Sequence, residues 1–320
     1  MSVNTEELHG FDLKTMVDAR NEMPSILYQY TDIDAFQGII EKNEIWATHW
    51  RYLNDKNELK YGIKLIEDGI QWCKQRKYSI ETKKFLDLFE GKITNVSSYE
   101  LLKNEDLYII SLSKKKDLLS QWRGYGRKYK SVCIGFSTKK MKVGVPFSNG
   151  LEYSASWEDE DNIYKFRKIL YDEQQQKGMA ITFVKAVCDG IEKEMQKGEL
   201  KMTHEERVDS FLKKNISGLL CIKEPCWKEE KEWRVIVQPK KTGSLNNIKF
   251  RKNEYGLVPY IPINFSETTM MDSIHTVYLP RSDYYLISKK SMEMYWNSMM
   301  KKHKCKHGLK IFRSKISIVY

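Results

Sequence analysis

The sequence lacks any long hydrophobic run. No stretch approaches the roughly 20 consecutive apolar residues that a membrane-spanning helix needs. The first twenty residues carry four acidic side chains and no apolar segment, which argues against a secretory signal. We therefore expect a cytoplasmic protein that makes no contact with a membrane.

Proline, glycine and paired cysteines are also scarce. With 7 Pro and 17 Gly in 320 residues, a fibrous or low-complexity chain is excluded. The 6 cysteines form no Cys-x-x-Cys pair, so in a reducing compartment they are most simply free thiols. The segment His303-Lys-Cys305-Lys-His307 offers three metal ligands, but no second ligand cluster accompanies it. We expect no bound metal, and zinc at this segment is the minor alternative.

Several common functional motifs are missing. The sequence contains no Gly-x-Gly-x-x-Gly or P-loop glycine pattern, so dinucleotide-binding Rossmann sites and Walker-type sites have no support. It also contains no Gly-x-Ser-x-Gly elbow and no His-Glu-x-x-His pair. The spacings of helix-turn-helix, RRM and zinc-finger modules are likewise absent.

What the sequence does have is positive charge and aromatic surface. Its net charge is +11, and it contains 8 Trp and 19 Tyr. Such a balance favours an anionic partner, either RNA, DNA or a phosphate-rich small ligand, although a solvated lysine surface is the common alternative. The basic side chains concentrate in segments 114–116, 123–130 and 301–315.

Hydrophobic periodicity predicts a mixed α+β chain. Residues 1–23 read as a polar lead-in, and residues 24–320 as one domain with a charged, helical insertion at about 158–217. Helices and strands do not alternate regularly, which disfavours a parallel βαβ fold. Further helices are expected over 32–40, from about 55 to 73 and over 284–301. Strands are expected at 25–31, 44–48, 107–112, 131–137, 150–156, 232–237, 257–263, 275–279 and 309–319.

Four blocks, in order, resemble the DUF2971 family over about residues 24–285. Each block alone would be weak, but their shared order makes a chance match improbable. The blocks are Leu-Tyr-Gln-Tyr-Thr at 27–31 with Ile-Trp-Ala-Thr at 45–48, Tyr-Leu-Asn-Asp at 52–55 with Glu58, Ser-Gln-Trp-Arg-Gly-Tyr at 120–125 with Ile-Gly-Phe at 134–136, and Trp-Lys-Glu-Glu-Lys-Glu-Trp-Arg at 227–234 with Leu-Val-Pro-Tyr-Ile at 257–261.

The DUF2971 family is similar in layout to ADP-ribosyltransferases, which cleave NAD and pass ADP-ribose to an acceptor. The resemblance implies a split antiparallel β-sheet core with flanking helices and with NAD in the cleft. It implies transfer to a nucleic acid or a protein, and a role as a bacterial toxin or anti-phage defence effector with a possible neutralising partner protein. An NAD hydrolase and a catalytically silent module that binds nucleic acid or protein are the alternatives.

Two acidic residues near the end of the match are the candidate catalytic groups. Glu230 and Glu232 are two residues apart on an expected strand, with Arg234 two further on, so all three should share one face. The resemblance implies that Glu232 holds the ribose 2′-hydroxyl of NAD and stabilises the oxocarbenium-like charge. Glu230 would then orient the acceptor or act as a base. The alternative is a structural ion pair with Arg234.

The early block supplies candidate NAD-binding residues. Family members usually have a histidine where this chain has Gln29, and glutamine still offers a donor and an acceptor to a ribose hydroxyl. Its neighbours Tyr30 and Thr31 would contact the nicotinamide end. The substitution implies that NAD binds differently or that activity is weaker, and an ordinary edge-strand role for Gln29 is the alternative.

Three further residues complete the candidate site. The resemblance implies that Tyr125 stacks on nicotinamide, since an aromatic ring suits a flat apolar partner. Arg51 is expected near the NAD phosphates, because a guanidinium binds phosphate in a bidentate manner. Asn54 is the second phosphate candidate, while its neighbours Asp55 and Glu58 are explained by capping of the following helix.

Overall fold

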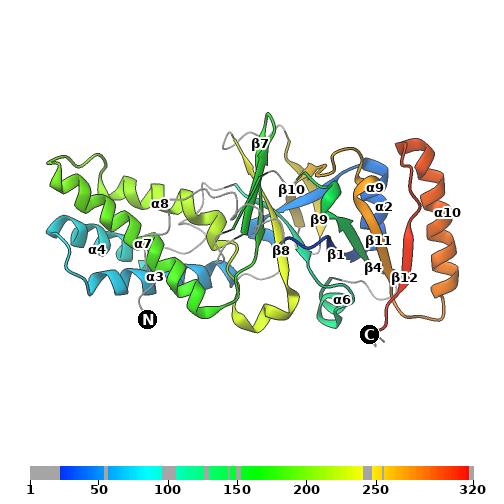
Figure 1. Cartoon of the computed structure of the whole chain (residues 1–320), viewed down its shortest axis with the longest axis horizontal. Coiled ribbons are helices and arrows are strands. Elements are labelled where there is room, and N and C mark those ends of the chain that lie inside the picture. The colour runs from blue at the N-terminus through cyan, green and yellow to red at the C-terminus, as the bar shows by residue number, and fades with distance from the viewer. Residues whose placement is uncertain are drawn as a thin grey trace.

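The computed structural model describes residues 22–53, 57–95, 106–125, 130–142, 145–148, 153–240, 247–253 and 256–316. The chain is a mixed α+β protein, which confirms the expected class (Figure 1). Its strands are β1 (Ile26–Asp32), β2 (Ile45–His49), β3 (Tyr108–Ser113), β4 (Ser131–Ser137), β5 (Val145–Ser148), β6 (Tyr153–Glu158), β7 (Asn162–Lys168), β8 (Glu232–Pro239), β9 (Lys249–Asn253), β10 (Gly256–Ile263), β11 (Ile274–Leu279) and β12 (Lys310–Arg313).

The helices lie mainly at the two ends of the molecule, with the strands between them (Figure 1). Among the described residues, none of the helices is long and apolar enough to cross a membrane. The α-helices are α2 (Ile33–Lys42), α3 (Glu58–Lys74), α4 (Ile80–Asn95), α6 (Leu119–Tyr125), α7 (Glu173–Gln196), α8 (His204–Leu219), α9 (Met270–Ser273) and α10 (Tyr285–His303), and the short 3-10 turns are η2 (Trp50–Tyr52), η4 (Thr138–Lys140) and η5 (Pro225–Glu230).

The described strands form one large, open, branched sheet. Its main path runs in the order β12-β11-β4-β1-β3-β8-β7-β6-β5, and β2, β10 and β9 form a side branch. Every pairing is antiparallel except that of β11 with β12, which makes the sheet mixed. The described strands thus form one branched, mixed sheet, whereas the resemblance implies a split antiparallel core.

The branch point is β3. One of its edges pairs with β8 along its whole length. Near its start β3 pairs with β2, where Ile109 is opposite Thr48, and at its end it pairs with β1, where Ser113 is opposite Tyr28. The strands β1 and β2 therefore diverge along β3, and this fork is the feature that positions the candidate site.

Close packing at the centre of the sheet depends on one glycine. Gly135 of β4 lies opposite Tyr28 of β1, and the side chains of Tyr28, Ile26 and Thr276 fill the space where a Cβ atom would stand. Any side chain at this position would have to displace its neighbours, since protein interiors are close-packed.

Two apolar cores support the sheet. The first packs α2, α9 and α10 against the β1-β4-β11 region, and it includes Phe36, Phe136 and Trp296. Asp32 caps the N-terminus of α2, because its carboxylate accepts a hydrogen bond from the Ala35 N–H at 2.8 Å.

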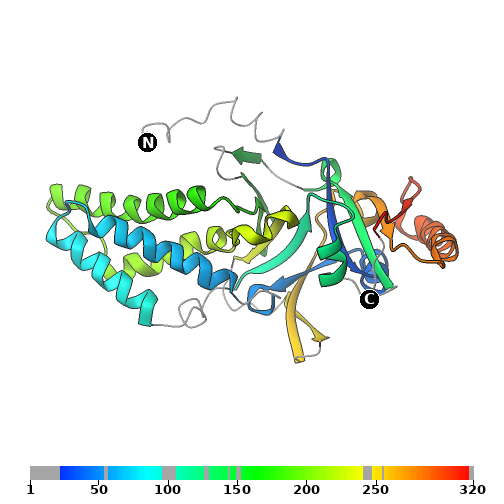
Figure 2. The same cartoon turned by 90° about the horizontal axis from the view of Figure 1, so that it is seen from below.

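The second core joins α3, α4, α7 and α8, which pack side by side at one end of the molecule (Figure 2). Its buried side chains include Ile66, Phe85 and Val184. The sequence placed a helical insertion at about 158–217, but the first part of that range is strand β7, and the helices begin at Glu173. The helical layer is also shared with α3 and α4, which precede it in the chain. Most of the lead-in at 1–23 lies outside the described residues.

Candidate functional site

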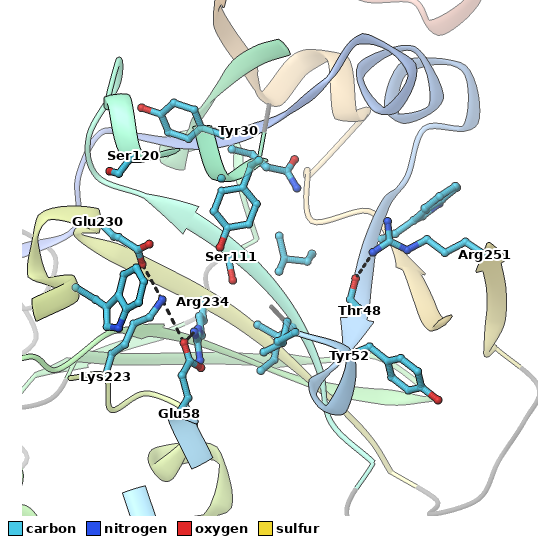
Figure 3. Close-up of a pocket in the computed structure, with 18 residues that line it drawn as sticks. Tyr30, Thr48, Tyr52, Glu58, Ser111, Ser120, Lys223, Glu230, Arg234 and Arg251 are labelled. Carbon is cyan, nitrogen blue, oxygen red and sulfur yellow. Dashed lines mark hydrogen bonds and ion pairs between the residues drawn. The ribbon is translucent and has the colours of Figure 1, made fainter. Parts of the chain in front are cut away.

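A cavity of about 520 Å³ opens at the fork between β1 and β2 (Figure 3). Its walls come from β1, β2, β3, β8 and β9, and from η2, the start of α3, α6 and η5. Its volume lies within the range of roughly 300–1,000 Å³ that is usual for small-molecule sites. The fold therefore brings the early block of the sequence, residues 27–31, to the same cavity as the late block, residues 227–234.

Aromatic rings surround this cavity. Tyr52, Tyr125 and Trp227 line it and are 48%, 38% and 42% exposed. Trp46, also in the wall, stacks on Tyr260 with 4.4 Å between ring centroids. Large exposed rings beside a cavity are suited to stacking on a planar ligand.

Five charged side chains form a buried cluster at one side of the cavity, and none is more than 7% exposed. Lys223 is central, because its Nζ lies 2.7 Å from Glu230 Oε2, 3.1 Å from Glu232 Oε2 and 3.2 Å from Glu58 Oε1. Three carboxylates therefore surround this one ammonium group. We call Glu58, Lys223, Glu230, Glu232 and Arg234 the charge cluster.

Arg234 is the second cation of the charge cluster. Its guanidinium donates to both carboxylate oxygens of Glu232, at 2.7 and 3.1 Å, and to Glu58 Oε1 at 2.8 Å. It also donates to the Leu220 carbonyl. This pairing is strong because a guanidinium matches a carboxylate in geometry as well as in charge.

The two candidate catalytic acids have opposite pKa shifts. Burial by itself would raise the pKa of Glu232, but the charges of Arg234 and Lys223 outweigh it and lower that pKa to about 2. Burial raises the pKa of Glu230, and its hydrogen bond with Lys223 only partly offsets this effect. Glu232 is thus held ionised, whereas Glu230 is the better proton acceptor of the two.

Three polar atoms in the cavity wall have no hydrogen-bond partner within the described part of the chain. They are Glu58 Oε2, Gln29 Oε1 and Ser120 Oγ, and each is buried from solvent. Buried acceptors without a partner are costly. Their position suggests that a ligand with hydroxyl or amide donors completes this site.

Four of the residues expected at the site line the cavity: Gln29, Tyr30, Tyr125 and Glu230. A fifth, Glu232, lines a small recess of about 30 Å³ whose wall also includes Tyr30, Tyr125 and Glu230. Although Tyr125 as a whole is 38% exposed, the surrounding protein partly removes its hydroxyl from water. This desolvation raises the pKa of Tyr125 to about 12, and the charge of Glu232 adds to the shift.

Tyr30 contributes its ring rather than its hydroxyl. The hydroxyl donates to the Lys115 carbonyl at 2.9 Å and accepts from the Leu118 N–H at 2.9 Å. The ring meets Trp122 edge-on, with 5.3 Å between centroids. Trp122 is fully buried and belongs to the packing beneath the site.

The remaining expected residues lie elsewhere. Thr31 pairs with Val132 in the β1–β4 ladder and is not part of the cavity wall. Arg51 is also outside that wall, and its guanidinium carbon lies 4.9 Å from the centroid of the Trp50 ring. Asn54 falls outside the described residues.

The placement of Glu230 on a strand was wrong. Glu230 ends the 3-10 turn η5, Lys231 takes a left-handed conformation with φ of 46°, and β8 begins only at Glu232. The left-handed Lys231 turns the chain between Glu230 and Glu232. This turn, and not the alternation of side chains along a strand, brings both carboxylates to Lys223. Glu232 and Arg234 do share a strand face, as their hydrogen bonds show.

Sequence reasoning missed Lys223 and undervalued Glu58. Capping seemed to account for Glu58, yet it is buried and reaches Arg234, which is 176 residues away in sequence. Lys223 directly follows four buried apolar residues, Leu219 to Ile222. A lysine at the end of such a run was the available signal, since buried lysines are nearly always paired.

A further arginine, Arg251, lies across the cavity from the charge cluster. Arg251 of β9 donates to Thr48 Oγ1 of β2 at 3.1 Å, and both side chains line the cavity (Figure 3). Guanidinium groups favour phosphate. The cavity therefore offers a buried, acid-rich end and an arginine-bearing end.

Comparison with known proteins gives one partial match. Residues 121–235 match the model of DUF2971, described as a protein family of unknown function. No curated protein and no solved structure matches the chain. The matched segment contains Tyr125 and most of the charge cluster, whereas β1, β2 and Glu58 lie outside it.

Proposed function

We propose that this chain is an NAD-dependent ADP-ribosyltransferase that binds NAD in the cavity at the β1–β2 fork. The observation that carries the proposal is the cavity itself, which combines aromatic rings, an acid-rich charge cluster and an arginine. Three carboxylates face two cations in the cluster, so its net charge is negative. That sign complements the positive nicotinamide ring of NAD.

The two ends of the cavity suggest an orientation for NAD. The nicotinamide ring lies beside Tyr125 and Trp227, close to Glu230, and the pyrophosphate lies toward Arg251 and Thr48. Ribose hydroxyls would then meet unpartnered acceptors such as Glu58 Oε2 and Gln29 Oε1. In this arrangement Gln29 accepts from a ribose hydroxyl without needing the charge of a histidine.

The proposed reaction breaks the bond between nicotinamide and ribose C1′. Nicotinamide leaves with the electron pair of that bond, and C1′ gains oxocarbenium character. Glu232, held ionised by Arg234 and Lys223, stabilises this charge from the recess. An acceptor oxygen or nitrogen then attacks C1′ and passes its proton to Glu230, whose raised pKa suits this role.

The surroundings of the cavity favour an anionic acceptor. The exposed lysines of segment 114–116 belong to the loop that holds Tyr30. This loop also contacts the catalytic segment, because the Lys114 N–H donates to the Lys231 carbonyl at 2.9 Å. Lysines here would attract a nucleic acid backbone or an acidic protein surface to the site. We propose RNA, DNA or a protein as the acceptor. The same proposal includes a role as a toxin or anti-phage effector, and a partner protein that neutralises the activity.

The test is transfer of label from NAD. Wild type, Glu230→Gln and Glu224→Gln are incubated with labelled NAD and with RNA, DNA or lysate, and modified acceptors are identified by mass spectrometry. Glu224 is the matched control because it is an exposed glutamate of the same segment. We expect transfer by wild type and Glu224→Gln, with a loss of about 100-fold or more in Glu230→Gln. Equal transfer by all three proteins would remove Glu230 from the mechanism.

A second candidate function is a binding module without catalysis. It is favoured by the ion pairs of the charge cluster, since each of the three carboxylates contacts a cation. Such a protein would show a thermal shift with RNA but neither a shift nor turnover with NAD. Free ADP-ribose without any labelled macromolecule would instead identify an NAD hydrolase.

A further inference from the structure

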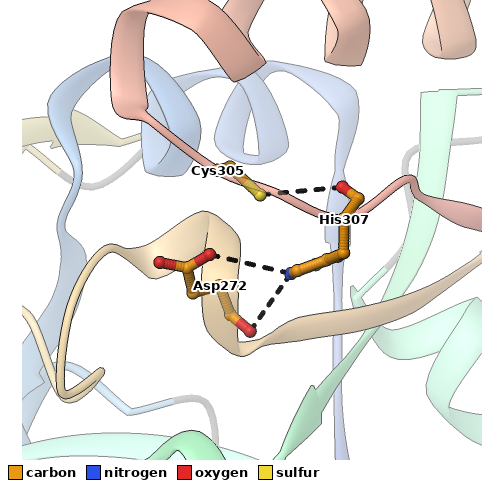
Figure 4. Close-up of side chains that lie close together, drawn as sticks. All are labelled: Asp272, Cys305 and His307. Carbon is orange, nitrogen blue, oxygen red and sulfur yellow. Dashed lines mark hydrogen bonds and ion pairs between the residues drawn. The ribbon is translucent and has the colours of Figure 1, made fainter.

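Three potential metal ligands converge at the far end of the sheet, away from the fork. Asp272 belongs to α9, just before β11, while Cys305 and His307 follow α10. One ligand atom from each residue lies within 4.8 Å of the other two (Figure 4). Carboxylate, thiolate and imidazole together are ligands typical of zinc.

The spacing suits a tetrahedral ion. His307 Nε2 lies 3.9 Å from Asp272 Oδ1. Bonds of about 2.0–2.3 Å to a tetrahedral zinc ion place its ligand atoms roughly 3.3–3.8 Å apart. Small rotations of these side chains would therefore close the set around one ion.

Both ring nitrogens of His307 have an oxygen nearby. Nδ1 lies 3.3 Å from the Gly308 carbonyl, and Nε2 lies 3.3 Å from the Asp272 carbonyl and 3.9 Å from Asp272 Oδ1. In the tautomer with hydrogen on Nδ1, this N–H can donate to Gly308, which leaves Nε2 as the ligand atom on the side of Asp272.

Neighbouring groups already fix the orientation of these ligands. The hydroxyls of Thr268 and Thr269 donate to Asp272 Oδ2 at 2.6 and 3.1 Å, which leaves Oδ1 toward His307. The Trp296 indole N–H donates to the His307 carbonyl at 3.1 Å. Such outer contacts are typical of metal sites, where they hold the ligands in place.

We propose that Asp272, Cys305 and His307 bind one zinc ion, with water at the fourth position. Binding replaces the thiol proton of Cys305, which passes to solvent, by a sulfur–zinc bond. Cys305 is 5% exposed, so the bond would be shielded, while the more open His307 leaves a path for entry. This site is independent of the proposed transferase activity.

The ion would hold the last part of the chain to the body of the protein. β12 is the edge strand of the sheet and pairs only with β11 among the described strands. A bond from Asp272, before β11, to the segment that leads into β12 would fix the connection between these strands. The Cys305–His307 pair was visible in the sequence, but Asp272 was not, because it lies about thirty residues earlier in another element.

The test uses cobalt as a spectroscopic substitute for zinc. Full-length protein, purified without chelator, is analysed for metal content and then, after metal removal, titrated with Co²⁺. We expect one zinc per chain, and a sulfur-to-cobalt charge-transfer band that saturates at one equivalent. Cys305→Ser should abolish the band, and Asp272→Asn should weaken binding at least tenfold.

Two matched controls separate this site from adventitious binding. Cys226→Ser removes an exposed thiol, and His303→Asn removes a histidine that is outside the set. Both variants should retain zinc and the cobalt band. The proposal is overturned if wild type takes up no metal, or if Cys305→Ser binds zinc as tightly as wild type does.

Discussion

Glu230 and Glu232 share one ammonium group: Lys223 Nζ lies 2.7 Å from the first carboxylate and 3.1 Å from the second. The two acids reach this position from different structures, a 3-10 turn and a strand, joined by the left-handed Lys231. Lys223 therefore links Glu230, which lines the cavity, to Glu232, which is also paired with Arg234. This arrangement makes the charge cluster both a structural element and the proposed catalytic centre.

Removal of Lys223 should be strongly destabilising. Lys223→Met leaves three buried carboxylates with Arg234 as the remaining cation of the charge cluster, and breaking a buried ion pair costs about 3–5 kcal/mol. Urea unfolding should show this loss in the free energy of unfolding. Lys228→Met is the control, since Lys228 is exposed in the same segment and should change stability by less than about 0.5 kcal/mol. An equally small effect at Lys223 would contradict the ion pairing described here.

The contribution of Glu232 to stability should depend on pH. Its pKa is lowered from 4.5 to about 2 in the folded state. The ionised form therefore contributes stability that is complete above pH 4.5 and is lost as the pH falls through about 2. The difference in unfolding free energy between wild type and Glu232→Gln should shrink as the pH falls from about 6 to 3. Glu229→Gln, at an exposed neighbour, should differ little from wild type throughout, and a constant gap for Glu232→Gln would show that its pKa is not lowered.

The aromatic rings should carry part of the binding energy for NAD. Trp227→Ala should weaken NAD binding by about tenfold, because loss of one stacked ring costs about 1–1.5 kcal/mol. Calorimetric titration measures this directly. Tyr284→Ala serves as the control, since Tyr284 is 68% exposed and outside the cavity wall. If both variants bind NAD as wild type does, the ring of Trp227 does not contact the ligand.

Gly135 should tolerate no side chain. In Gly135→Ala the new methyl group would meet Thr276 Oγ1 and the Tyr28 ring, and such overpacking costs about 1–3 kcal/mol. Thermal unfolding is the measurement. Gly178→Ala is the opposite control, because Gly178 lies in α7 with nothing near its Cβ position, and alanine there should stabilise the helix by up to about 1 kcal/mol.

Local patterns predicted most individual elements. The apolar and aromatic side chains of residues 25–31 predicted β1, and the 3-4 spacing of apolar residues from Leu59 to Cys73 predicted α3. Short-range patterns work here because each element buries one face. They failed at β7, where a charged strand was read as part of a helical insertion. Half-buried charged residues, Lys165 and Arg167, alternate with its buried positions and hid the strand.

The charge cluster could be predicted only in part. Glu232 and Arg234 are two residues apart on one strand, so their contact follows from strand geometry. Glu58 and Lys223 join them through tertiary packing, and contacts between residues far apart in sequence leave no local signal. For the same reason Asp272 could not be matched with Cys305 and His307 before the fold was known.

The most direct test of the central claim is the rate at which nicotinamide is released from NAD by folded wild type and folded Glu232→Gln. We predict release by wild type, release at a similar rate by Glu224→Gln, and a loss of at least about 100-fold in Glu232→Gln, because that variant lacks the carboxylate that stabilises the charge on C1′. The account is contradicted if wild type releases no nicotinamide under conditions with candidate acceptors present, or if Glu232→Gln releases it at the rate of wild type.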